Sequence, residues 1–186
     1  LKSGVTITSR GCPRKCPWCF VPEREGAIRE LPIVPGWIIQ DNNLLACSES
    51  HVKQVFAMLR RQRRGAVFSG GLDARLLDHW HADALCDMRV SELWFAADSD
   101  RALNPLGRVA WMLSGHFPRD KMRCYVMIGR NETIGQAQER LEKVYQLGFL
   151  PFAQLYCFGL TYLQQVCQRF AKAITQGIAA AQSAGV

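Results

Sequence analysis

Short apolar strand patterns alternate with amphipathic helix patterns along most of this chain, and this alternation constrains its fold more than any other feature. The segments expected as strands are residues 5–8, 37–40, 66–68, 92–97, 121–128 and 149–156. The segments expected as helices are residues 48–64, 76–89, 101–114, 133–147 and 161–180. Strands joined by helices form a parallel sheet that the helices cover, with right-handed crossovers.

Five or six parallel strands are too few to close a barrel of eight. We therefore expect an α/β fold in which five to six parallel strands form an open, partial βα barrel with the helices outside. The 186 residues show no repeat, linker or low-complexity segment, so we expect a single domain over residues 1–186. Reactive groups in such folds collect at the carboxyl ends of the strands.

Residues 10–32, which are rich in Arg, Glu and Pro, are expected to form a loop after the first expected strand, and three cysteines are concentrated in it. Cys12, Cys16 and Cys19 fall within eight residues, with the spacing Cys-x3-Cys-x2-Cys. Pro13 and Pro17 exclude a regular helix through them, so the loop must wrap back on itself, as a loop that holds a metal centre does. A four-iron cluster normally takes one thiolate for each iron. A loop with three cysteines therefore leaves one iron without a protein ligand.

A zinc site and a disulfide framework are the alternatives to an iron–sulfur cluster. Structural zinc takes four protein ligands, usually as two Cys-x2-Cys-like pairs or as cysteines with histidines. The sequence offers no second pair, and the nearest histidine, His51, lies more than thirty residues further on. Eight cysteines among 186 residues are too sparse for a disulfide scaffold. The spacing favours a cluster over zinc.

The cysteine spacing, with the aromatic residue Trp18 just before the last cysteine, resembles the cluster-binding loop of the radical S-adenosylmethionine (SAM) enzymes. The resemblance extends over about residues 4–157. It implies a radical SAM-type partial barrel in which Cys12, Cys16 and Cys19 bind a [4Fe–4S] cluster. It also implies that the amino and carboxylate groups of SAM chelate the open iron, and that reduction yields a 5′-deoxyadenosyl radical.

The resemblance further implies SAM contacts on other loops of the same sheet edge. Gly70 and Gly71 match the family's two-glycine motif, where the backbone approaches the methionine amino group and a side chain would block that approach. Residues beside the last cysteine shield the cluster and contact adenine in the family, and polar residues at a later strand end contact the ribose. The expected cofactor-binding residues are Trp18, Phe20, Ser69, Gly70, Gly71, Asp98 and Ser99.

Other residues near this edge have no assigned role. The stretch after the two glycines departs from the family's commoner Gly-Gly-Glu-Pro form, so Asp73 and Arg75 stay open. Arg75 could bind the SAM carboxylate or an anionic substrate, or form an ion pair at the start of the next helix. Arg130 lies in a further loop of the edge. Cys157 ends the last expected strand, where packing is favoured over substrate contact or a role as an auxiliary ligand. Cys86 and Cys124 fit core positions.

The chain carries a formal net charge of +7, which favours anionic partners such as nucleotides or nucleic acid. The densest basic run, residues 60–64, ends an expected helix, and a solvated helix end is favoured over a nucleic-acid patch there. No run of eighteen apolar residues and no signal-peptide pattern is present, so we expect no membrane partner. Free thiols and an oxygen-sensitive cluster suit a reducing cytoplasm.

These observations favour a radical SAM enzyme that acts on an unidentified substrate, either small or brought by a partner protein. The net positive charge favours a nucleotide, a modified base or RNA as the substrate. Such an enzyme needs an electron donor such as flavodoxin or ferredoxin. The alternatives are a zinc-stabilised nucleic-acid-binding module and a simple iron–sulfur electron-transfer protein.

Overall fold

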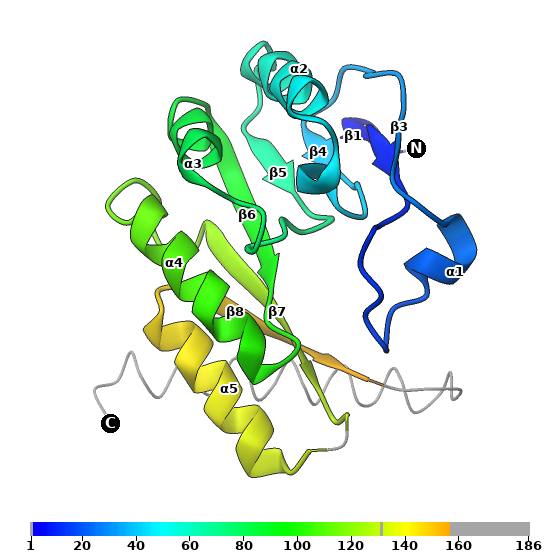
Figure 1. Cartoon of the computed structure of the whole chain (residues 1–186). Helices are drawn as coiled ribbons and strands as arrows, with labels where there is room; N and C mark the ends of the chain where they lie inside the picture. Colours follow the sequence, from blue (N-terminus) through cyan, green and yellow to red (C-terminus); the bar gives the residue numbers. More distant parts are fainter. Residues whose placement is uncertain (1, 131, 157–186) are drawn as a thin grey trace.

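Six parallel strands form the main sheet, in the spatial order β1-β4-β5-β6-β7-β8 (Figure 1). The computed structural model describes residues 2–130 and 132–156. The strands are β1 (Val5–Thr6), β4 (Ile38–Ile39), β5 (Ala66–Phe68), β6 (Val90–Ala96), β7 (Met122–Ile128) and β8 (Leu150–Leu155). Each of the six expected strands is present, so the expectation of an α/β fold with a parallel sheet is confirmed.

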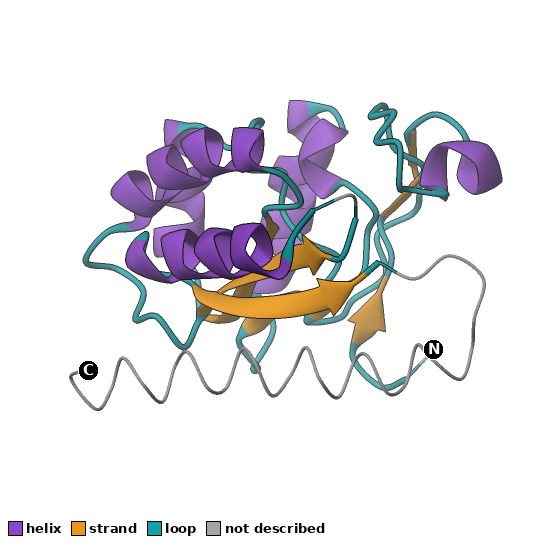
Figure 2. Ribbon diagram, turned by 90° about the horizontal axis from the view of Figure 1, so that it is seen from below, coloured by secondary structure: helices purple, strands orange, loops and turns teal. Residues whose placement is uncertain are grey.

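Four helices cover one face of this sheet (Figure 2). They are α2 (Glu49–Arg60), α3 (His79–Cys86), α4 (Leu103–Leu113) and α5 (Ile134–Gln146). Ser48 begins α2 by accepting a hydrogen bond from the His51 backbone amide, and Thr133 begins α5 in a reciprocal capping box with Gln136. The expected helix over residues 161–180 lies outside the described residues, as do Cys157 and Cys167.

The hydrophobic core lies between these helices and the sheet. Side chains of β7 are alternately buried and half-buried, as expected for a strand with one face against a core. Phe56, Phe68, Phe95 and Phe149 are completely or almost completely buried. Cys124 lies within the same core and Cys86 packs against it, as expected from the apolar patterns around them.

The segment over residues 10–32 was expected to be a loop throughout, and this expectation is wrong in part. It contains a five-residue helix, α1 (Val21–Glu25), and a strand, β3 (Arg29–Glu30), which pairs antiparallel with β2 (Ser9–Arg10). Pro22 lies in the first turn of α1, where its missing N–H costs nothing. The β2–β3 pair closes the cysteine loop at its base, and Figure 1 shows this part standing to one side of the main sheet.

Several helix boundaries also differ from expectation: α2 ends at Arg60 and α3 at Cys86, before the expected ends at residues 64 and 89, and two helices begin later than expected. The helix expected over residues 76–89 begins at His79, because the preceding residues form a turn in which Leu76 and Leu77 donate to the Asp73 carbonyl. The helix expected over residues 101–114 begins at Leu103, after the short 3₁₀ helix η2 (Asp100–Ala102). Another 3₁₀ helix, η1 (Leu44–Ala46), precedes α2. Within the described residues, no helix has the length and apolar character needed to cross a lipid bilayer.

Candidate metal centre and adjoining pocket

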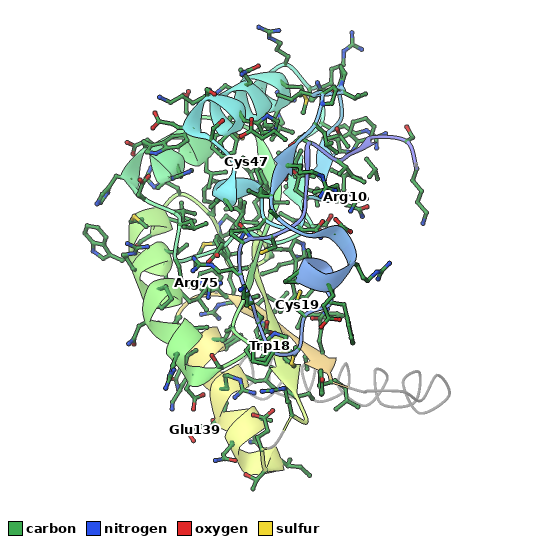
Figure 3. The ribbon with its side chains drawn as sticks, turned by 45° about the vertical axis from the view of Figure 1, so that its right-hand side comes forward. Arg10, Trp18, Cys19, Cys47, Arg75 and Glu139 are labelled. Carbon is green, nitrogen blue, oxygen red and sulfur yellow. The ribbon has the colours of Figure 1, made fainter. Side chains whose placement is uncertain are left out.

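The carboxyl ends of the parallel strands meet at one edge of the sheet, and the cysteine loop lies at this edge. The loop follows β1, the polar residues 41–43 follow β4, and residues 69–71 follow β5. Residues 98–100 follow β6, and Arg130 follows β7. Figure 3 shows Trp18, Cys19 and Arg75 on this side of the molecule, with Cys47 apart from them beside η1. The topology therefore gathers loops that are far apart in the sequence.

The three cysteines share one electrostatic environment. All three side chains are partly exposed and none is in a disulfide. Burial raises the pKa of the Cys16 thiol, the positive charge of Arg75 lowers it, and the neighbouring Cys19 and Cys12 raise it again. The charges of Cys19 and Cys12 therefore act on Cys16, and all three thiols lie on the loop between β2 and β3.

Two N–H groups point at the sulfur of Cys12. The backbone amide of Arg14 lies 3.5 Å from this sulfur, and the side-chain amide Nδ2 of Asn43 lies 3.6 Å from it. Asn43 is only 4 % exposed, so its contact with the sulfur is shielded from water. Hydrogen bonds from N–H donors stabilise a thiolate, which is the form of cysteine that binds metals.

A carboxylate joins the cysteine loop to the loop that follows β5. Asp73 accepts hydrogen bonds from Arg14 at 3.0 Å, from Arg75 at 2.7 Å and from Asn43 at 3.3 Å. Burial raises the pKa of Asp73, but its hydrogen bonds and ion pair with Arg75, together with Arg14, outweigh burial and lower the pKa below the ordinary value. Arg75 therefore forms its ion pair with Asp73, and its charge also reaches Cys16 and Cys12.

The two glycines after β5 occupy positions that a side chain would disturb. A Cβ atom on Gly70 would lie 2.1 Å from the carbonyl oxygen of Asp41, and Gly71 has a φ of +87°. The hydroxyl of Ser69 donates to the Ile39 carbonyl at 3.1 Å, so this side chain hydrogen-bonds the backbone of the neighbouring strand β4. Gly70 thus allows close backbone packing against Asp41, and Gly71 adopts a backbone conformation that favours glycine.

Trp18 connects the cysteine loop to the ends of β6 and β7. Its side chain donates a hydrogen bond to Asp98, which also accepts from the Met127 backbone amide at 3.2 Å. Burial raises the pKa of Asp98, and the hydrogen bonds from Met127 and Trp18 act against that increase. The guanidinium of Arg130 lies 5.0 Å from the centre of the Trp18 ring, in a cation–π contact.

A pocket of about 260 Å³ adjoins this contact. Its walls include Trp18, Asp98, Ser99, Met127, Arg130 and Glu132. Arg140 of α5 also lines it, donates to the Met127 carbonyl at 2.7 Å and pairs with Glu132. The Nε atom of this buried arginine has no hydrogen-bond partner within the described part of the chain, and neither has the Oδ1 atom of Asn43.

The expected cofactor-binding residues do not all line the same pocket. Trp18, Asp98 and Ser99 line one pocket, whereas Gly70 and Gly71 lie beside β4. Phe20 precedes α1, is half exposed, and is not among the described residues that line this pocket. Sequence reasoning missed Asn43, Arg14 and Arg140 as site residues. The run Asp41-Asn-Asn43 has only the polar composition of a loop, and no spacing links it to Cys12.

Across residues 2–130 and 132–156, no group of three or more His, Cys, Asp or Glu side chains is placed to hold one metal ion. A four-iron cluster binds each thiolate through a different iron, so it requires wider separation of the sulfurs than a single ion does. No family model matches the chain, and no curated protein matches it.

Proposed function

We propose that this chain is a radical SAM enzyme in which Cys12, Cys16 and Cys19 hold a [4Fe–4S] cluster and leave one iron for SAM. The observation that carries the proposal is the Cys-x3-Cys-x2-Cys loop at the carboxyl edge of a parallel α/β sheet. This edge is where such folds place their chemistry. Three thiolates for four irons leave one coordination site open.

The residues around the loop fit an iron–sulfur cluster with SAM. The Cys12 sulfur accepts hydrogen bonds from N–H groups of Arg14 and Asn43, and such hydrogen bonds stabilise a metal-bound thiolate. The Oδ1 atom of Asn43 is buried without a partner among the described residues, and a buried polar atom of this kind fits a ligand that supplies the missing donor. Arg75 adds positive charge beside Cys16 and Cys12, which favours an anionic cluster.

When bound, the cluster and SAM would supply a reductively generated 5′-deoxyadenosyl radical that abstracts hydrogen from the substrate. The chain's own residues would position and shield that chemistry. Gly70 lets the backbone pass close to the Asp41 carbonyl, and Gly71 adopts a positive φ, so the two glycines set the course of the loop that would approach SAM. Trp18 interacts with Asp98 and forms a cation–π contact with Arg130. Its ring would shield the side of the cysteine loop that faces β6 and β7. Asp98 and Ser99 present polar groups to the adjoining pocket.

The partners in this proposal follow from charge and redox needs. A net charge of +7 favours an anionic substrate, and we propose a nucleotide, a modified base or RNA, either free or delivered by a partner protein. A low-potential donor such as flavodoxin or ferredoxin would reduce the cluster. The chemistry belongs in the reducing cytoplasm, where cysteines stay unoxidised.

Anaerobic reconstitution with iron and sulfide, followed by a reductant and SAM, tests the proposal. The wild-type chain should bind about four irons and four sulfides and release 5′-deoxyadenosine. Cys16→Ala should lose both the cluster and this product. The matched control, Cys86→Ala, removes a thiol that packs against the core and should keep both.

Two other outcomes would replace the proposal with its alternatives. One tightly bound zinc with no SAM cleavage would identify a zinc-stabilised module, which would bind nucleic acid through its basic surface. A stable cluster that is reduced without releasing 5′-deoxyadenosine would identify an electron-transfer protein. Full cleavage activity in Cys16→Ala would show that the ligands are assigned wrongly.

A further inference from the structure

The amino ends of β5, β6 and β7 carry a surface that is strongly basic and lies opposite the candidate metal centre. We call this surface the basic edge and define it as residues 60–64, 87–92 and 119–123. It contains eight arginines and lysines and three carboxylates, so it holds five of the chain's seven net positive charges. The charge of this protein is therefore concentrated on one side of the sheet.

The sheet topology assembles the basic edge from three separate segments. The strands β5, β6 and β7 are neighbours and run parallel, so the segments before them lie side by side. Arg89 donates from Nη1 to the carbonyl of Arg63, and Lys121 donates from Nζ to the carbonyl of Val90 at 3.0 Å. These contacts join each segment to its neighbour. Neighbouring strands lie about 4.8 Å apart, so the three segments form a row about 10 Å across.

Most of these cations have no carboxylate partner. Arg60 pairs with Asp87, and Arg123 pairs with Glu92. The other six form no ion pair with any described residue: Arg61, Arg63, Arg64, Arg89, Arg119 and Lys121. All of these except Lys121 are exposed. The charge of the edge is thus available to a partner.

Two of the arginines are held over aromatic rings. Arg64 lies 4.8 Å from the centre of the Trp37 ring, and Arg119 lies 3.9 Å from the centre of the Tyr145 ring. These contacts limit the positions of the two guanidinium groups. A guanidinium that is already oriented loses less conformational freedom when it binds a planar or tetrahedral oxyanion.

We propose that the basic edge binds the phosphate backbone of a nucleic acid. Guanidinium groups form bidentate hydrogen bonds with phosphates, and a row of unpaired arginines matches the repeated charges of a strand. No large, exposed hydrophobic side chain of the described residues lies in the three segments, so the edge lacks the apolar groups that insert into a membrane.

The position of the basic edge separates this role from the proposed radical chemistry. The basic edge ends at residues 92 and 123, and four to five further residues of β6 and β7 follow, so about 15 Å of strand lies between the basic edge and the carboxyl ends of these strands. An electron donor must approach the cluster, and the basic edge is at the wrong end of the strands for it. The basic edge would anchor nucleic acid whether or not the cysteines hold a cluster.

Fluorescence anisotropy with a labelled single-stranded RNA of about 20 nucleotides, and with the same sequence as DNA, tests this inference at about 50 mM salt. The double variant Arg61→Ala/Arg63→Ala should bind about tenfold more weakly than the wild type. Two lost phosphate contacts should also reduce the slope of log K against log salt by about 1.4. Arg61→Lys/Arg63→Lys should recover most of the affinity, because it keeps the charge.

Lys53→Ala/Lys143→Ala is the matched control. It removes the same charge from exposed positions that pair with Glu49 and Glu139 on α2 and α5, and it should bind as the wild type does. Cys16→Ala should also bind normally, which keeps this test separate from the proposed function. Equal weakening by both double variants, no binding by the wild type, or binding only to vesicles containing phosphatidylserine would each overturn the inference.

Discussion

At the scale of single residues, the candidate centre depends on contacts that no motif contains. Asn43 reaches the Cys12 sulfur from the loop after β4, thirty-one positions away in the sequence. Its amide is buried, and its Nδ2 atom is shared between that sulfur and Asp73. In the proposed enzyme this side chain would stabilise the thiolate that binds iron and so adjust the electron affinity of the cluster.

Replacing Asn43 by leucine should lower the reduction potential of the reconstituted cluster by on the order of tens of millivolts, because a hydrogen bond to a ligand sulfur is lost. An EPR-monitored redox titration measures this shift. Asn104→Leu, which changes an exposed residue of α4, serves as the control. An unchanged potential in Asn43→Leu, with the cluster present, would show that the contact has no electronic role.

Gly70 should tolerate no side chain. Its Cβ would lie 2.1 Å from the Asp41 carbonyl oxygen, so Gly70→Ala should lower the free energy of unfolding by about 1–3 kcal/mol. Gly135→Ala in the first turn of α5 meets no atom closer than 3.9 Å and should raise that free energy by at most about 1 kcal/mol. Urea denaturation of both variants measures the two changes. Equal stabilities would mean that the backbone at Gly70 has room to move.

At the scale of elements, Asp73 connects two segments that the sheet alone leaves separate. Its ion pairs with Arg14 and Arg75 tie the cysteine loop to the turn before α3. The carboxyl is almost completely enclosed, with a side chain 6 % exposed. The helix expected from Leu76 starts later because residues 73–77 form a turn, in which Leu76 and Leu77 donate to the Asp73 backbone carbonyl.

The network should make the stability of the chain depend on pH. The pKa of Asp73 is lower in the folded chain than its ordinary value, so its ionised form stabilises the fold. This stabilisation is complete above the ordinary pKa of 3.8 and is lost as the pH falls through the lowered value. Asp73→Asn should therefore be less stable than the wild type at pH 7, and the difference should shrink below about pH 4.

Asp98 provides the contrasting case, because burial raises its pKa. Its ionised form opposes folding, so Asp98→Asn should lose little stability at pH 7 or gain some. Denaturation curves of both variants between pH 3 and pH 7 compare the two carboxyls. A loss of stability at pH 7 that is as large for Asp98→Asn as for Asp73→Asn would contradict this account of the two environments.

At the scale of the whole molecule, the six strands were predictable because each is a run of apolar or β-branched residues between loop signals. The α1 helix and the β2–β3 pair were not, because these short elements consist mainly of polar residues and contain no apolar run. The cysteines could be singled out by their spacing alone. The contacts of Asn43, Asp73 and Arg140 could not, because they depend on which loops the parallel sheet places side by side.

The same topology separates the two surfaces that this account assigns. The carboxyl ends of the strands carry the cysteine loop, and the amino ends of β5, β6 and β7 carry the basic edge. In the sequence, the basic run at residues 60–64 resembles an ordinary helix end, and only the sheet order places residues 89 and 119–123 beside it. A nucleic acid held at one edge and radical chemistry at the other are therefore independently testable.

The proposed enzyme depends on three cysteines that hold a four-iron cluster and leave one iron for SAM. EPR spectra of the reduced, reconstituted chain, recorded with and without SAM, test whether that iron is open. We predict a cluster signal whose g values shift when SAM is added, because the cofactor binds the open iron. A cluster signal that SAM leaves unchanged, or a chain that assembles no cluster, would contradict the claim.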